Sequence, residues 1–199
     1  MEAASAEGTA VIAAAPPAAH AVDRGGRLLR HPLPVTLLAV GLATLAFTSY
    51  SAPADGAIAA FIAAILVVIA AIDLERRIIP NRVVLPATAL VLAARVAVSP
   101  SHTADYVLAA IGAGLVFLIP NLINRSAMGM GDVKLAVFLG AGLGRGVVGA
   151  IVVAFISVFP FAVGALIRGG LAARKSTLPF GPFLALGGLV VLIVPRLVG

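Results

Sequence analysis

The sequence contains no cysteine and no tryptophan, and it has few charged residues. Without cysteine the chain can form no disulfide, no Cys-ligated zinc site and no thiol nucleophile. Charged residues occupy 11% of the 199 positions and hydrophobic residues 61%, which is more apolar surface than a soluble domain of this length can bury. The composition therefore indicates a protein that contacts membrane lipid.

Seven apolar segments predict an all-α, polytopic membrane protein with about seven transmembrane helices. A hydrocarbon core of about 30 Å needs about 20 helical residues at a rise of about 1.5 Å each. The third segment fits if Arg95 snorkels to one membrane face. The predicted segments are 33–51, 57–73, 83–98, 105–123, 132–145, 147–167 and 178–196.

The chain divides into three parts. Residues 1–31 are rich in alanine, with scattered Pro, Gly and charges, and predict a disordered cytosolic tail. Residues 32–55 predict an extra amino-terminal transmembrane helix, which we interpret as an uncleaved anchor, with a cleaved signal segment as the alternative. Residues 56–199 hold the remaining transmembrane segments.

The basic residues set the expected orientation. The net charge of +6 does not indicate nucleic-acid binding, because Lys and Arg lie between apolar segments and not on one amphipathic face. With a cytosolic amino terminus, 11 of the 14 basic residues lie inside and three lie outside, as the positive-inside rule requires. The three outside are Arg95, Arg145 and Arg196. We therefore expect a multi-pass protein of a bacterial-type cytoplasmic (inner) membrane, with its carboxyl terminus outside.

The segment 132–145 is shorter than the others. Only ten uncharged residues separate Lys134 from Arg145, about 15 Å of helix. Either its charged ends extend it, or the helix begins inside the protein and the loop 126–132 lies below the membrane surface. Irregular backbone at that depth needs cover from protein or a wet cavity, so a functional cleft is plausible there.

Two of the eight acidic residues lie where ordinary surface charges are not expected. Asp55 and Asp105 lie in predicted external loops, where an exposed aspartate needs no explanation. Asp73 instead ends one apolar segment and Asp132 opens another, both on the cytosolic side, and acids at membrane depth indicate function. Either could also be a plain helix cap or interfacial charge. Gly129 and Gly131 favour function beside Asp132, because they permit close backbone approach and unusual dihedral angles.

Three motifs resemble a known family. Residues 73–81, Asp-Leu-Glu-Arg-Arg-Ile-Ile-Pro-Asn, resemble the first-aspartate segment of type IV prepilin leader peptidases. Residues 129–132, Gly-Met-Gly-Asp, resemble the Gly-x-Gly-Asp box which those enzymes share with presenilin-type intramembrane proteases. Residues 179–187 are similar to the family's last membrane segment, and the resemblance covers 56–199.

The resemblance implies an aspartic endopeptidase that cleaves the leader of prepilin or pseudopilin substrates at the cytosolic membrane face. Such substrates combine a basic leader with an apolar helix. Asp73 and Asp132 would be the catalytic pair, sharing one proton. Helix position suggests a hypothesis for the resting state: Asp132, at a helix start, is ionised, and Asp73, at a helix end, holds the proton.

The supporting residues have simpler alternatives. Pro80 and Asn81 are expected to shape the turn after Asp73. Lys134 could tune Asp132 or bind substrate backbone, or it could be a plain headgroup anchor. Asn121 and Asn124 could satisfy backbone groups freed by Pro120 or line the cleft. The three histidines are scattered, so no metal site is expected.

The chain departs from the larger members of that family. Those members carry a cytosolic domain with paired cysteines and also N-methylate the new pilin terminus, using S-adenosylmethionine. This chain has no cysteine, so peptidase activity alone is expected, without a cofactor. A small proton-coupled transporter or a structural subunit of a pilus or secretion assembly remains an alternative.

Overall fold

The computed structural model describes residues 32–123, 129–169 and 179–194, and every regular element in these ranges is helical. The predicted tail 1–31, Asn124 and residues 126–128 of the loop 126–132 lie outside the described residues. The α-helices are α2 (Pro32–Thr48), α3 (Pro53–Arg76), α4 (Asn81–Val98), α5 (Thr103–Ile123), α6 (Met130–Leu143), α7 (Val147–Gly169) and α8 (Gly181–Ile193). Two short 3-10 helices, η1 (Pro100–His102) and η2 (Gly144–Gly146), join α4 to α5 and α6 to α7.

The predicted membrane-embedded helical class is confirmed. Each of the seven predicted apolar segments coincides with one of the α-helices in the described ranges. Four helical stretches are long and apolar enough to cross a membrane, whereas α2 and α8 are shorter apolar helices. The number of seven crossings therefore stays a prediction. The four stretches are Pro53–Arg76, Asn81–Val98, Pro100–Ile123 and Met130–Gly164.

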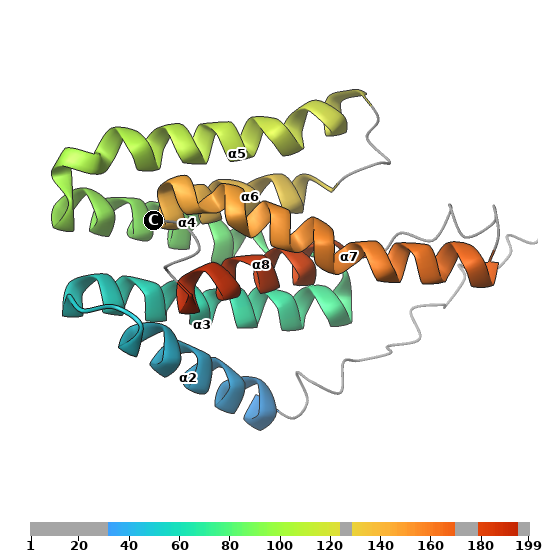
Figure 1. Ribbon diagram of the computed structural model, residues 1–199, viewed down its shortest axis with the longest axis horizontal. Coiled ribbons are helices and arrows are strands. Elements are labelled where there is room, and N and C mark those ends of the chain that lie inside the picture. Colours follow the sequence, from blue (N-terminus) through green and yellow to red (C-terminus); the bar gives the residue numbers. More distant parts are fainter. Residues whose placement is uncertain (1–31, 124–128, 170–178, 195–199) are drawn as a thin grey trace, which may run out of the picture.

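The short helix α6 occupies the centre of the bundle (Figure 1). It packs against α5, α4, α8, α7 and α3, while α2 lies against α3 at the outside. Leu135, Phe138 and Leu139 have no exposed surface. With 14 residues α6 is about 21 Å long, which is less than the hydrocarbon thickness. It therefore cannot reach both membrane surfaces by itself.

Small residues let α5 approach α6 closely. A Cβ atom on Gly140 would lie 2.5 Å from the carbonyl oxygen of Ala109 and from the Cα atom of Ala110, where no real side chain fits. The two helices therefore contact each other backbone to backbone, as membrane helices with small interface residues do.

A buried arginine, Arg95, lies at the end of the bundle where α6 ends. Arg95 donates from Nη1 to Oδ1 of Asp55 at 2.6 Å and from Nε to the carbonyl oxygen of Gly142 at 2.9 Å. Its guanidinium also lies 5.2 Å from the centre of the Tyr106 ring. Gly142 belongs to the last turn of α6, whose carbonyl groups have no partner within the helix. Arg95 therefore satisfies the end of α6 and is neutralised by Asp55.

Two expectations about this end are wrong. Arg95 does not snorkel to a membrane face, because only 5% of the residue is exposed. Asp55 and Asp105 are not free loop acids: they lie in the first turns of α3 and α5 and pair with Arg95 and Arg145. The physical reason is the low dielectric of the interior, where an arginine persists only with a nearby acid and carbonyl partners.

The two ion pairs give a matched test of this arrangement. Asp55→Asn leaves a buried guanidinium without its counter-charge, and we expect it to lower the free energy of unfolding by about 3 kcal/mol. Asp105→Asn breaks a pair whose arginine side chain is 83% exposed, so we expect a loss below about 1 kcal/mol. Unfolding by SDS titration in mixed micelles measures both, and equal losses would contradict the capping role of Arg95.

Candidate active site

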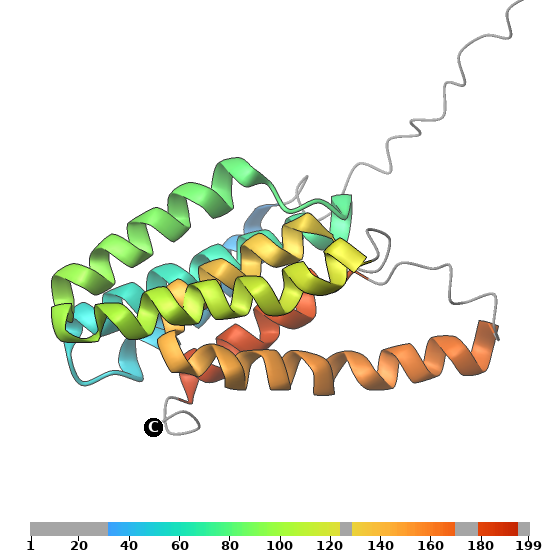
Figure 2. The same cartoon turned by 90° about the horizontal axis from the view of Figure 1, so that it is seen from above.

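The chain directions bring the two candidate acids to one end of the bundle. At this end α3 and α5 stop, and α4, α6 and α8 begin (Figure 2). Asp73 lies in the last turn of α3 and Asp132 in the first turn of α6. We call this the aspartate end. The Arg95 cluster lies at the opposite end.

Asp73 is buried at the junction of three helix ends. Only 5% of the residue is exposed. Its backbone oxygen accepts a hydrogen bond of 2.8 Å from the N–H of Arg77, the left-handed residue (φ 53°) that ends α3. Its carboxylate accepts a hydrogen bond from the backbone N–H of Gly181, the first residue of α8. The start of α8 therefore points directly at this acid.

Asp132 is the third residue of α6 and is not its N-cap. Gly129 takes the N-cap position, in extended conformation. The N–H of Gly129 donates to the Asp132 carboxylate, while the N–H of Asp132 donates to the oxygen of Gly129 at 3.1 Å. The Asp132 carboxylate makes the half of a capping box that reaches back to the N-cap N–H, whereas Gly129 has no side chain to make the other half. Asp132 thus helps to start α6, and its carboxyl group remains partly exposed.

The two carboxyl groups interact electrostatically across the aspartate end. They come from helices that run in opposite directions, one at its end and one at its start. Two neighbouring carboxyl groups can divide acid and base roles between them.

Ile79 packs between the start of α6, which carries Asp132, and the start of α8, which contacts Asp73. A Cβ atom on Gly131 would lie 2.9 Å from Cβ and 3.2 Å from Cδ1 of Ile79, and one on Gly181 would lie 3.3 Å from the same Cδ1. The side chain therefore fills the space between the starts of α6 and α8. Gly131 is explained by this close approach, as expected.

The expected unusual dihedral angles are absent. Among the described residues only Arg77 and Gly144 have positive φ, so neither Gly129 nor Gly131 does. The glycines at Asp132 provide space for Ile79 and for the capping turn, and not a strained backbone.

The remaining motif residues link α4 to α6. Pro80 is the N-cap of α4, and its carbonyl accepts hydrogen bonds from Val83 and Val84 at 3.0 and 3.1 Å. Asn81 accepts a hydrogen bond of 2.7 Å at Oδ1 from Nζ of Lys134. The ion pairs found in the described part of the chain do not include Lys134. Lys134 therefore contacts the turn after Asp73 and not the Asp132 carboxylate.

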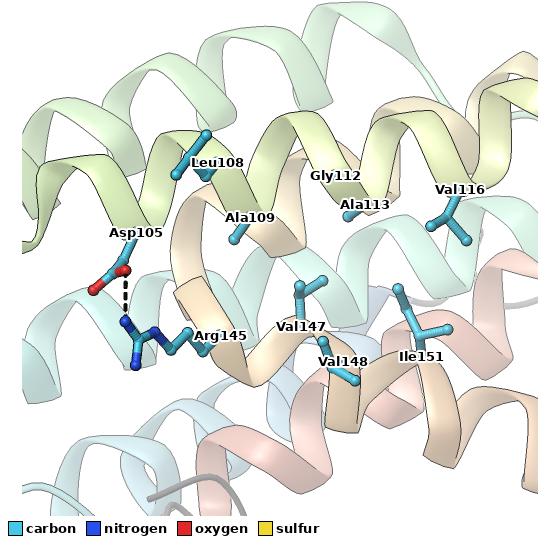
Figure 3. A pocket seen from close by; sticks show the side chains of 10 residues that line it. All are labelled: Asp105, Leu108, Ala109, Gly112, Ala113, Val116, Arg145, Val147, Val148 and Ile151. Carbon is cyan, nitrogen blue, oxygen red and sulfur yellow. Dashed lines mark hydrogen bonds and ion pairs between the residues drawn. The ribbon is translucent and has the colours of Figure 1, made fainter.

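An apolar pocket lies away from the two acids, between α5 and α7 (Figure 3). It encloses about 450 Å³, and the ion pair between Asp105 and Arg145 lies at one end of it. Neither Asp73 nor Asp132 lines this pocket. Within the described ranges, no three His, Cys, Asp or Glu side chains gather as a metal-binding cluster.

Comparison with known proteins identifies the family. The profile of the type IV leader peptidase family matches residues 60–167, more than half of the chain, and this range includes both aspartates. The chain belongs to the type IV leader peptidase family. Searches of curated proteins and of solved structures gave no match. As a type IV leader peptidase-like protein it is a protease, and its long apolar helices make it a membrane protein.

Sequence reasoning missed two residues of the site in this leader peptidase. Ile79 lies within the first motif, residues 73–81, and Gly181 lies within residues 179–187, for which we expected no role at the site. Both contact the aspartate end. Asn121, whose two alternatives were left open, is buried in α5 with 7% of its surface exposed.

The contact between Ile79 and Gly131 can be tested by a double-mutant cycle. Gly131→Ala forces Ile79 to shift, and we expect it to destabilise the protein by about 1–3 kcal/mol. In an Ile79→Ala background the smaller neighbour can yield, so we expect a coupling of about 0.5 kcal/mol or more between the two changes. Gly112→Ala, where nothing lies within 4 Å of a new Cβ, is the control and should be nearly neutral. Additive losses in SDS unfolding would exclude the contact.

Proposed function

We propose that this protein is an aspartic endopeptidase that removes the leader from type IV prepilin-like or pseudopilin substrates at the cytosolic membrane face. Asp73 and Asp132 are the catalytic pair. The single observation that carries the proposal is the convergence of these two carboxyl groups, one from α3 and one from α6, at one end of the bundle. Membership of the type IV leader peptidase family supports the proposed substrate class.

Hydrolysis needs only the pair and one water. The ionised aspartate takes a proton from the water, whose oxygen attacks the scissile carbonyl carbon. The protonated aspartate hydrogen-bonds the carbonyl oxygen as negative charge develops there. The peptide C–N bond then breaks, a proton passes from the pair to the leaving amine, and the pair returns to its shared single proton.

The resting protonation state is less simple than helix position suggests. The hypothesis of an ionised Asp132 and a protonated Asp73 assumed that only Asp132 faces a helix start. Asp73 also receives an N–H from the start of α8, and Asp132 receives the N–H of Gly129. Because both carboxylates face a positive helix end, the dipole argument does not separate them. The proton belongs to the pair.

The proposed orientation places the aspartate end in the cytosol. Arg76, Arg77 and Arg82 belong to the end of α3 and the start of α4, beside Asp73. The opposite end carries Arg95, which is neutralised by Asp55, and Arg145, which pairs with Asp105. The basic residues at the aspartate end fit the positive-inside rule, which places this end at the cytosolic headgroup layer.

Substitution of either aspartate tests the proposal. Asp73→Asn and Asp132→Asn should each lower kcat/KM for a prepilin-type substrate by about a thousandfold or more, because each removes one partner of the acid–base pair. Both variants should still insert into the membrane. Asp105→Asn, an acid change at the opposite end, should keep wild-type cleavage. Full cleavage by either site variant would reject the mechanism, and proton-coupled flux or mere assembly without cleavage would favour the alternatives.

The pH dependence tests the shared proton. Activity requires one ionised and one protonated carboxyl group, so kcat should fall at low pH, when both are protonated, and at high pH, when both are ionised. We expect a bell-shaped profile for the wild type in detergent micelles with a synthetic leader substrate. A profile with one limb would exclude a proton-sharing pair.

A further inference from the structure

The start of α8 meets Asp73 at a position without a side chain. Gly181 is the first residue of α8 and is buried. Its backbone N–H donates a hydrogen bond to the Asp73 carboxylate. Pro182, the next residue, has no N–H, so Gly181 provides the N–H at this point of the helix start. This donor reaches an acid that lies more than one hundred positions earlier in the sequence.

Only glycine leaves room for the carboxylate. A Cβ atom on residue 181 would collide with Oδ2 of Asp73 and lie 3.1 Å from its Cγ. Only 5% of the Asp73 residue is exposed. Its carboxyl group therefore has little free space into which it could move. A larger residue would therefore displace the carboxyl group from its present place facing Asp132.

An aromatic cluster fixes the position of this donor. The ring of Phe180, the N-cap residue of α8, lies 5.7 Å from that of Phe117 on α5 and 5.4 Å from that of Phe155 on α7. The carbonyl of Phe180 also accepts hydrogen bonds from Phe183 and Leu184 at 3.0 and 3.1 Å. The N–H of Gly181 is therefore held in place by three helices before any substrate binds.

We propose that Gly181 is a positioning residue for the catalytic pair. Its N–H holds the Asp73 carboxyl group, and its missing side chain provides the space in which that group faces Asp132. The start of α8 is thus a third part of the active site, beside the two aspartate motifs. This role rests on the proposed peptidase function, since it acts through Asp73.

Gly181→Ala tests the role by separating kcat from KM. The added methyl group displaces the Asp73 carboxyl group but leaves the substrate-binding surfaces, so we expect kcat to fall by about a hundredfold while KM stays within about twofold. Gly188→Ala is the matched control on the same helix. Its new Cβ would lie 2.6 Å from Cδ2 of Leu139 and 2.9 Å from Cδ1 of Leu66, so it disturbs packing without touching the acids. We expect Gly188→Ala to keep kcat within about threefold.

An NMR measurement tests the contact without activity. In ¹⁵N-glycine-labelled protein the Gly181 amide proton, bound to a carboxylate, should shift upfield in Asp73→Ala, whereas the Gly188 amide should not move. This experiment decides the contact even if Gly181→Ala does not fold.

The outcomes separate this inference from the proposed function. A wild-type protein that cleaves no leader substrate rejects the proposed function. Wild-type cleavage together with an unchanged kcat in Gly181→Ala, or a Gly181 amide that does not respond to Asp73→Ala, rejects the role of Gly181 alone.

Discussion

The architecture depends on a helix at the centre of the bundle, α6, that by its own length is too short to cross the membrane. Between Val133 and Gly142 most residues of α6 are buried, and five other helices pack against it. In a medium without water its two ends must find polar partners inside the protein. At one end Arg95 contacts the carbonyl of Gly142, and at the other the Asp132 carboxylate accepts the N–H of Gly129. The candidate acid is therefore fixed in depth and direction by the helix that it starts.

Contacts between Ile79 and two glycines hold the aspartate end together. Ile79 fills the space between the starts of α6 and α8, and glycines at 131 and 181 leave that space open. Each element that reaches this end contacts one of the others, so the separation of the two carboxyl groups depends on packing and not on a direct bond between them. The segment from Asp73 to Asn81 thereby acts as a connector as well as the carrier of an acid.

The helices could be predicted from the sequence because a long apolar segment in a bilayer satisfies its own backbone hydrogen bonds as a helix. The common end of Asp73 and Asp132 also followed, since the number of crossings between them fixes their side. The partners of polar groups did not follow. Asp55 lies 40 residues before Arg95, and Gly181 lies far beyond Asp73, so only the packed bundle reveals either pairing. The helix-dipole hypothesis for the resting proton stays a prediction; it considered each acid only within its own helix and left out the contact of Asp73 with the start of α8.

The dependence of Asp73 on α8 has a consequence for biosynthesis. Ribosomes deliver helices to the membrane in chain order, so α3 and α6, with both acids, enter before α8. Until α8 arrives, the N–H of Gly181 is missing from the pocket of Asp73. Both acids of the proposed catalytic pair therefore enter the bilayer before α8, and the surroundings of Asp73 are complete only after α8 has been inserted.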